Sequence, residues 1–143
     1  MNSTIKLNAT WKGGYRTDVQ AGNHLIIIDQ PEGFGGKDEG ADPLTVFLSA
    51  LGGCLGTIAA IIARQERIKL NGFEVEVEGD IDKDFLLGKT EEGRAGFTEI
   101  RVNVNIDADM TNEEKQAFFA RVDARCPISD NMLHNTNINF AVK

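Results

Sequence analysis

The fold is decided by residues 43–63, whose sequence PLTVFLSALGGCLGTIAAIIA contains no charged side chain. Asp42 is a good N-cap and Pro43 a good first helical residue, so we expect a helix to begin here. Apolar residues recur along one face at helical spacing, and the opposite face is nearly as apolar. A helix that is apolar all round is either buried in a core or spans a membrane.

The length of this helix, about twenty residues, would permit a membrane span. However, the segments on both sides are typical of strands of one soluble sheet, and a membrane crossing would separate them. Burial is therefore favoured, and no membrane partner is expected. A chain of 143 residues is too small to surround such a helix by itself. The helix consequently predicts a partner subunit and an intertwined homodimer.

Three strands are expected before the helix. Residues 5–11 and 15–19 alternate between apolar and polar side chains and are separated by a Gly-Gly pair that suits a hairpin turn. Residues 24–29 (HLIIID) form a short β-branched run, typical of a strand buried on both faces. The glycine-rich acidic segment 31–42 is expected to be a loop.

The second half predicts a hairpin, two helices and a final strand. The pair Thr111 and Glu114 is a capping box that starts a helix. The expected elements are strands 73–77 and 100–106 joined by connection 80–96, helices 111–124 and 129–134, and strand 138–142. The order βββ-α-ββ-αα-β indicates an α+β protein, with antiparallel sheets around the long buried central helix and a single domain over residues 1–143.

Composition limits the possible partners. The formal net charge is −7 and the isoelectric point about 4.8, which argues against nucleic acid or an anionic membrane surface. We see no secretory signal at the N-terminus, and two cysteines without such a signal are expected to be free thiols in the cytoplasm. No cluster of four Cys or His residues is present, so neither a metal site nor a cofactor is expected.

Cys54 follows Gly52-Gly53 within the apolar helix. One interpretation is a core cysteine, because free cysteine is among the most buried residue types. The other is an activated thiol. Two glycines weaken a helix and allow close approach. If the helix kinks or restarts there, freed amide N–H groups would point toward Cys54 and favour its nucleophilic form.

Cys126 lies in Arg125-Cys126-Pro127, where proline interrupts the preceding helix. It is either a small buried residue or a second thiol, which a peroxide-reducing cysteine needs in order to trap its sulfenic acid as a disulfide. Arg16 gains significance only if a thiolate lies opposite it. The two histidines, His24 and His134, are not expected to be catalytic.

Two motifs resemble the OsmC/Ohr superfamily. The first combines Gly35-Gly36, the Asp42-Pro43 helix start and an apolar run that ends in Gly53-Cys54. The second is Cys126-Pro127-Ile128-Ser129, which is similar to that family's second cysteine motif. The expected order of elements also matches, so the resemblance covers essentially the whole chain.

The resemblance implies an OsmC-like homodimer with two active sites at the subunit interface. Cys54 would be the peroxidatic residue that attacks organic hydroperoxides, and Cys126 would resolve the sulfenic acid as a disulfide. A dithiol reductant, which is of the lipoyl type for the best-known members of the family, would restore the thiols. Arg16 stands where the family places an arginine that holds the thiolate, which suits a permanently charged donor of several hydrogen bonds.

One departure from the family pattern concerns the arginine. Peroxidase members usually carry a glutamate directly after the helix-start proline, and this chain has Leu44 there, followed by Thr45. Asp42, Glu39 or Asp38 could replace that carboxylate. The chain therefore resembles a divergent branch of the family.

Two hypotheses of function follow. The first is a thiol-dependent reductase of organic hydroperoxides, in which Leu44, Phe47 and Leu51 line the site and favour bulky peroxides over hydrogen peroxide. The alternative, motivated by the missing glutamate, is a non-catalytic binding or redox-sensing module that holds a small electrophile, a lipid-like ligand or a persulfide at Cys54. A structural dimer with inert buried cysteines is a third possibility.

Overall fold

The computed structural model describes all residues 1–143. They form two compact units, residues 1–47 and residues 48–143, which we describe separately. The elements confirm the α+β class and the antiparallel strands. In chain order they are β1 (Asn8–Trp11), β2 (Thr17–Ala21), β3 (His24–Ile28), a short 3-10 helix (Glu32–Phe34), α1 (Pro43–Glu66), β4 (Leu70–Ile81), α2 (Lys83–Leu86), β5 (Phe97–Ala108), α3 (Asn112–Ala124) and α4 (Pro127–Leu133).

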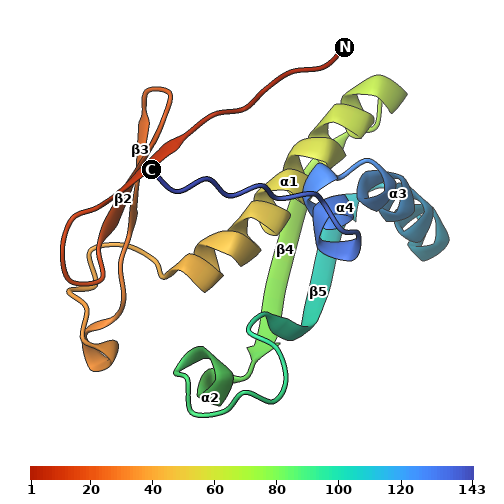
Figure 1. The fold of residues 1–143 in the computed structure, drawn as a ribbon. Coiled ribbons are helices and arrows are strands. Elements are labelled where there is room, and N and C mark those ends of the chain that lie inside the picture. The colour runs from red at the N-terminus through yellow and green to blue at the C-terminus, as the bar shows by residue number, and fades with distance from the viewer. The chain divides into compact units, whose positions relative to one another are not determined.

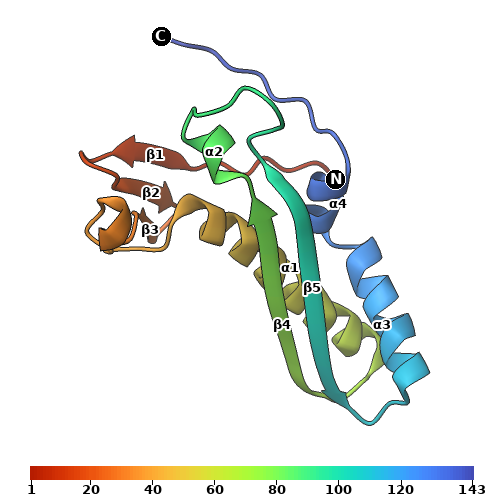
Figure 2. The same cartoon turned by 90° about the horizontal axis from the view of Figure 1, so that it is seen from below.

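The first unit contains a three-stranded antiparallel sheet in the order β1-β2-β3 (Figure 2). The expected turn at Gly13-Gly14 is confirmed, since both glycines have positive φ and the Trp11 indole N–H donates to the Gly14 carbonyl at 3.0 Å. The prediction that the third strand is buried on both faces is wrong within this chain. Leu25 and Ile26 of β3 are exposed, because nothing within the first unit covers them.

Helix α1 begins where its sequence predicts. The Asp42 carboxylate accepts hydrogen bonds from the N–H groups of Leu44 and Thr45 at 3.0 and 3.1 Å, and Pro43 is the first helical residue. The helix continues through Gly52-Gly53, so the break that would direct free amide N–H groups toward Cys54 is not present. By length and composition α1 is the one helix that could cross a membrane, a test that core helices of soluble proteins also pass.

The second unit is a layer of helices on a long β-hairpin. Strands β4 and β5 have 12 residues each and pair with Val75 opposite Val104 and Val77 opposite Val102. Their alternating apolar side chains pack against α1 and α3, which lie on the same face of the hairpin (Figures 1 and 2). The buried core consists of Leu51, Leu55, Ala59, Ile62, Ala63, Phe118, Val122 and Cys126. Only one face of α1 is therefore buried within this chain.

The C-terminal region follows the prediction up to its last element. Thr111 and Glu114 form the expected capping box at the start of α3. The predicted strand 138–142 is wrong, since residues 135–143 have no regular structure and Phe140 is 89% exposed. The alternating side chains suit a strand, but a strand also requires a neighbour with free backbone groups, and none pairs with this segment. Connection 80–96 contains the short helix α2, which was not predicted and is capped by Asp82.

Candidate active site

Two thiols meet in the second unit. The Sγ atoms of Cys54, on α1, and Cys126, at the N-cap of α4, lie 3.0 Å apart, and the Cys126 thiol donates to the Cys54 sulfur. Both cysteines are free. The chain thus brings together two thiols that are 72 positions apart in the sequence, which their spacing alone could not establish.

Cys126 lies at the break between helices α3 and α4. Helix α3 ends at Ala124, and the N–H of Cys126 donates to the Asp123 carbonyl at 3.1 Å. Pro127 then starts α4, where its missing N–H costs no helical hydrogen bond. The Ser129 hydroxyl donates to the Asp123 carboxylate at 2.6 Å across this break. The turn that carries Cys126 is therefore fixed on both sides of the sulfur.

Two side-chain contacts fasten α3 to the end of α1. The guanidinium of Arg121 lies 3.0 Å from the Glu66 carboxylate, and that of Arg125 donates to the Gln65 amide oxygen at 2.9 Å. Below these contacts Phe118 and Val122 are fully buried against α1. The helix that leads to Cys126 is thus packed directly on the helix that carries Cys54.

The two thiols have different surroundings. Cys126 is only 1% exposed, whereas Cys54 is partly exposed. Burial, with a further contribution from the hydrogen bond to Cys54, raises the pKa of the Cys126 thiol, and the backbone N–H groups of Ser129 and Ile128 oppose this only in part. Cys126 consequently keeps its proton at neutral pH, and Cys54 is the thiol that a reagent can reach.

Arg16 lies in the first unit between two carboxylates. Its Nε is 2.7 Å from an Asp18 oxygen, and its Nη1 pairs with Glu39. The hydrogen bond from Arg16 lowers the pKa of Asp18, and the Asp18 and Glu39 hydrogen bonds raise the pKa of Arg16. Of the three carboxylates considered as substitutes for the missing glutamate, Glu39 is the one that pairs with Arg16, and Asp42 instead caps α1.

Asp29, the buried carboxylate that holds the Glu39 loop, was not predicted from the sequence. Asp29 is 2% exposed and accepts hydrogen bonds from the backbone N–H groups of Gln30, Glu39 and Lys37 at 2.8, 3.1 and 3.3 Å. These bonds lower the pKa of its carboxyl group. An acidic residue that ends an apolar strand directly before a glycine-rich loop was the available signal.

The same loop needs glycine at two positions. A Cβ atom at Gly36 or Gly40 would lie 2.0 Å from the carbonyl oxygen of Gln30 or Ile27, respectively. The loop and the Gly13-Gly14 turn together border a cavity of about 540 Å³, which Arg16, Asp18 and Glu39 also line. Arg16 is therefore held by a defined loop within its own unit.

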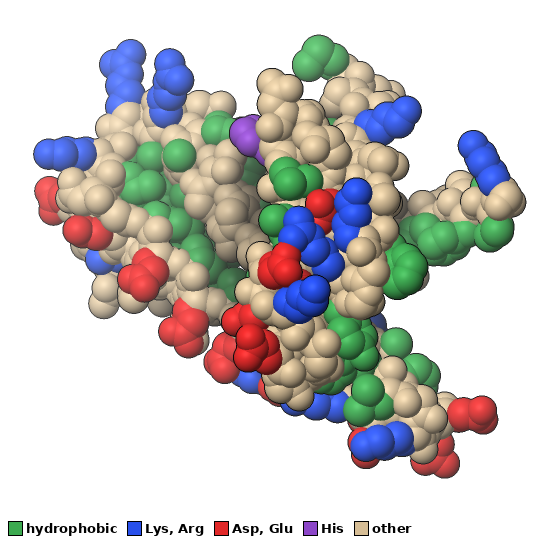
Figure 3. All heavy atoms as spheres, turned by 90° about the vertical axis from the view of Figure 1, so that its left-hand side faces the viewer, with side chains coloured by type: hydrophobic (Ala, Val, Ile, Leu, Met, Phe, Trp, Pro, Cys, Tyr) green, Lys and Arg blue, Asp and Glu red, His purple; other side chains and the backbone are tan.

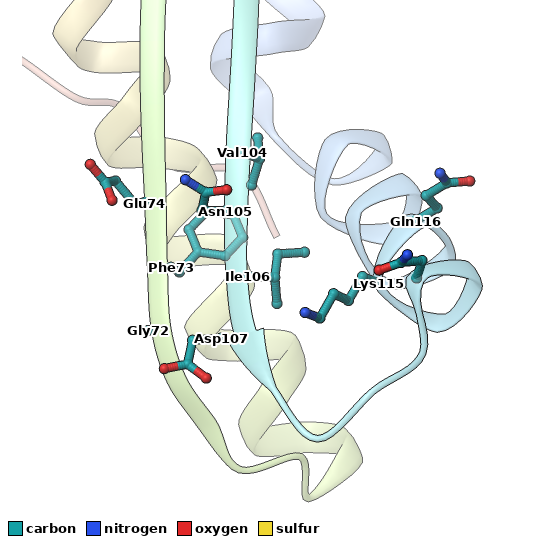
Figure 4. Close-up of a pocket in the computed structure, with 10 residues that line it drawn as sticks. Gly72, Phe73, Glu74, Val104, Asn105, Ile106, Asp107, Lys115 and Gln116 are labelled. Atoms are coloured by element: carbon teal, nitrogen blue, oxygen red, sulfur yellow. The ribbon is translucent and has the colours of Figure 1, made fainter.

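A second hollow, of about 600 Å³, lies between the β4–β5 hairpin and α3 in the second unit. Figure 4 shows the Lys115 side chain of α3 extending toward Ile106 of β5, whereas the Glu74 carboxylate lies on the outer side of β4. Neither cysteine lines this hollow. The structure also contains no group of three His, Cys, Asp or Glu residues arranged to hold a metal ion.

The predicted site residues thus fall into two sets. The structure brings Cys54 and Cys126 together in the second unit and describes Arg16 with its carboxylates in the first. A contact between Arg16 and Cys54 remains a prediction. Of the apolar residues expected to line the site, Leu51 lies in the core and Phe47 is exposed.

Comparison with known proteins confirms the resemblance. A family model described as "OsmC-like protein" matches residues 36–142. No curated protein matches the chain. Three solved structures show the range of relatives, and each aligns over most of its own length.

The first is an OsmC-like protein from Mycoplasma pneumoniae, with a TM-score of 0.81, 21% identity and coverage of 94% of this chain and 91% of that one. An organic hydroperoxide resistance protein from Elizabethkingia anophelis has a TM-score of 0.71, 25% identity and coverage of 94% and 91%. An organic hydroperoxide resistance protein OsmC from Legionella pneumophila has a TM-score of 0.69, 20% identity and coverage of 93% and 91%. Similarity at this level of identity establishes the fold that these proteins share with the chain.

Proposed function

The chain belongs to the OsmC-like family, and we propose that it is a thiol-dependent reductase of organic hydroperoxides. The observation that carries the proposal is the contact of 3.0 Å between the sulfurs of Cys54 and Cys126. Relatives described as organic hydroperoxide resistance proteins support the choice of substrate class. A buried thiol beside a more accessible one also suits a sulfur that is oxidised first and a sulfur that resolves it.

The proposed reaction uses two electrons from each thiol pair. The Cys54 thiolate attacks the terminal peroxide oxygen, the O–O bond breaks, and the alkoxide leaves and takes a proton to become the alcohol. Cys54 is then a sulfenic acid. The Cys126 thiolate attacks the Cys54 sulfur, the S–S bond forms, and hydroxide leaves. An external dithiol of the lipoyl type reduces the disulfide by thiol–disulfide exchange.

Arg16 is assigned the role of supporting the Cys54 thiolate during this attack. The proposal takes Asp18 and Glu39 as the carboxylates that hold Arg16, in place of the glutamate that Leu44 replaces. A guanidinium has five N–H donors, so two carboxylates leave donors available for an anion.

We also propose that the protein acts as a cytoplasmic homodimer. Large apolar side chains remain exposed on the single chain, among them Phe47, Ile61 and Phe140. Figure 3 shows hydrophobic side chains at the surface between charged ones. Apolar surface of this kind is typical of a face that another subunit covers. The free thiols are consistent with a reducing compartment.

The test is a stopped assay of cumene hydroperoxide consumption with dihydrolipoamide as the reductant. We expect the wild type to turn over, Cys54→Ser to be inactive, and Cys126→Ser to lose sustained turnover after about one equivalent. Hydrogen peroxide serves as the substrate control and should be consumed more slowly. Equal inactivity of the wild type and Cys54→Ser, with Cys54 still reacting with a thiol reagent, would instead favour the binding or sensing module.

A further inference from the structure

We propose that Cys126 acts already in the first chemical step: its S–H group donates a hydrogen bond to the Cys54 sulfur and stabilises the thiolate that attacks the peroxide. This inference rests on the proposed function for its place in the reaction, although the hydrogen bond itself is a property of the resting thiol pair. Cys126 thereby has a role that precedes its own oxidation.

The surroundings of Cys126 suit the role of a donor to the Cys54 sulfur. The backbone N–H of Ser129 lies 3.4 Å from the Cys126 sulfur and can only donate, so it uses the sulfur as an acceptor. The S–H proton of Cys126 therefore remains available, and the Cys54 sulfur lies 3.0 Å away. Burial of Cys126 raises its pKa, which keeps this proton in place at neutral pH.

The donor is also held in position before the reaction begins. Cys126 belongs to the same buried cluster as Phe118 and Val122, and the hydrogen bond between Ser129 and Asp123 fixes the turn around it. A thiol is a weak donor in water. A hydrogen bond in a buried, low-dielectric place is stronger, and a donor to an anion favours the charged form of its partner. Because the donor is already in position, it needs little reorganisation when charge develops on the acceptor sulfur.

The same proton gives the two steps their order. While Cys54 is an anion, the hydrogen bond keeps the proton on Cys126, so Cys126 is not yet a nucleophile. After the O–O bond breaks, Cys54 is a neutral sulfenic acid and the hydrogen bond has lost its charged acceptor. The departing alkoxide is then the stronger base, and transfer of the Cys126 proton to it yields the alcohol and the thiolate that forms the disulfide.

The experiment measures alkylation of Cys54 by iodoacetamide at pH 7, with the modified site identified by mass spectrometry. Cys126→Ser keeps a hydroxyl donor, and Cys126→Ala has none. We expect the rate for Cys126→Ser to stay within about threefold of the wild type and the rate for Cys126→Ala to fall about tenfold, as expected for one hydrogen bond to a charged group. Val122→Ala, which opens a cavity in the same cluster without removing a donor, controls for packing.

A second assay separates the two proposals. Sulfenic acid formation on Cys54 after one equivalent of cumene hydroperoxide is trapped with dimedone in the same variants, and should follow the alkylation rates. Equal alkylation rates in Cys126→Ala and Cys126→Ser, or the same tenfold loss in Val122→Ala, would overturn the hydrogen-bond role while leaving the peroxidase proposal intact. The expected alkylation pattern without any trapped sulfenic acid would support the hydrogen bond and contradict the peroxidase.

Discussion

Replacing Leu55 by alanine tests whether α1 packs on the hairpin as described. Leu55 is 1% exposed and lies in the core cluster with Phe118 and Val122. The substitution removes three carbon atoms, worth roughly 2 kcal/mol in transfer free energy at about 0.8 kcal/mol for each buried methylene. The cavity that remains adds to this, so we expect a total loss of about 3–4 kcal/mol in the free energy of unfolding.

Leu133→Ala is the matched control. Leu133 is 71% exposed on α4, so the same chemical change should alter the free energy of unfolding by less than about 0.5 kcal/mol. Urea denaturation followed by circular dichroism measures both variants at one protein concentration. With a slope of about 2 kcal/mol/M, Leu55→Ala should lower the midpoint by roughly 1.5–2 M and Leu133→Ala by less than about 0.3 M.

A loss below about 1 kcal/mol for Leu55→Ala, or equal losses in the two variants, would contradict this packing. Either result would mean that the Leu55 face of α1 is not enclosed by the hairpin and α3. The contact between Cys54 and Cys126 would then lose its basis as well, because Cys54 lies on the same helix, one residue before Leu55.

Two further predictions concern the first unit. Glu39→Gln should lower kcat/KM for cumene hydroperoxide only about 1.5- to fivefold, because a partly exposed ion pair contributes little. Glu32→Gln in the same loop should leave kcat/KM unchanged, and equal effects of the two substitutions would contradict the role of Glu39. Asp29→Asn tests a pH dependence. Hydrogen bonds lower the pKa of Asp29 in the folded protein. The stability that the Asp29 carboxylate contributes is therefore present above the pKa of the unfolded state and is lost as the pH falls through the pKa of the folded state. The stability difference between wild type and Asp29→Asn in urea should therefore be constant at neutral pH and shrink below about pH 4, the ordinary aspartate range, whereas the exposed Asp38→Asn should show no such change.

The parts of the fold that were predictable are those that a few neighbouring residues determine. Asp42 caps α1 and Thr111 caps α3 because each side chain reaches the N–H groups of the next turn. The errors concern positions that distant residues decide. Alternation at 138–142 could not show whether a neighbouring strand exists. Gly52-Gly53 left open whether the helix breaks or continues, because that depends on packing of the whole helix on the hairpin.

The candidate site likewise combines features that neighbouring residues determine with contacts that depend on distant residues. Proline after Cys126 predicted a break in the chain, but the 3.0 Å contact with Cys54 follows from how α3 packs on α1, which the motif does not contain. The partners of Arg16 were equally hidden. Asp18 is two residues away in the chain and thus close by, whereas Glu39 is 23 positions away and reaches Arg16 only through the loop bonded to Asp29.

These contacts bear on the missing glutamate. A carboxylate directly after the helix-start proline would hold an arginine from a helix, and Leu44 removes that possibility. In this chain the carboxylates come instead from a strand and a loop, and the loop depends on a third, buried carboxylate. The three backbone hydrogen bonds that hold this loop all end on the Asp29 carboxylate, so a change at Asp29 affects all of them at once. A change at Asp29, which Arg16 does not touch, should therefore disturb the position of Arg16 more than the loss of either carboxylate that pairs with it.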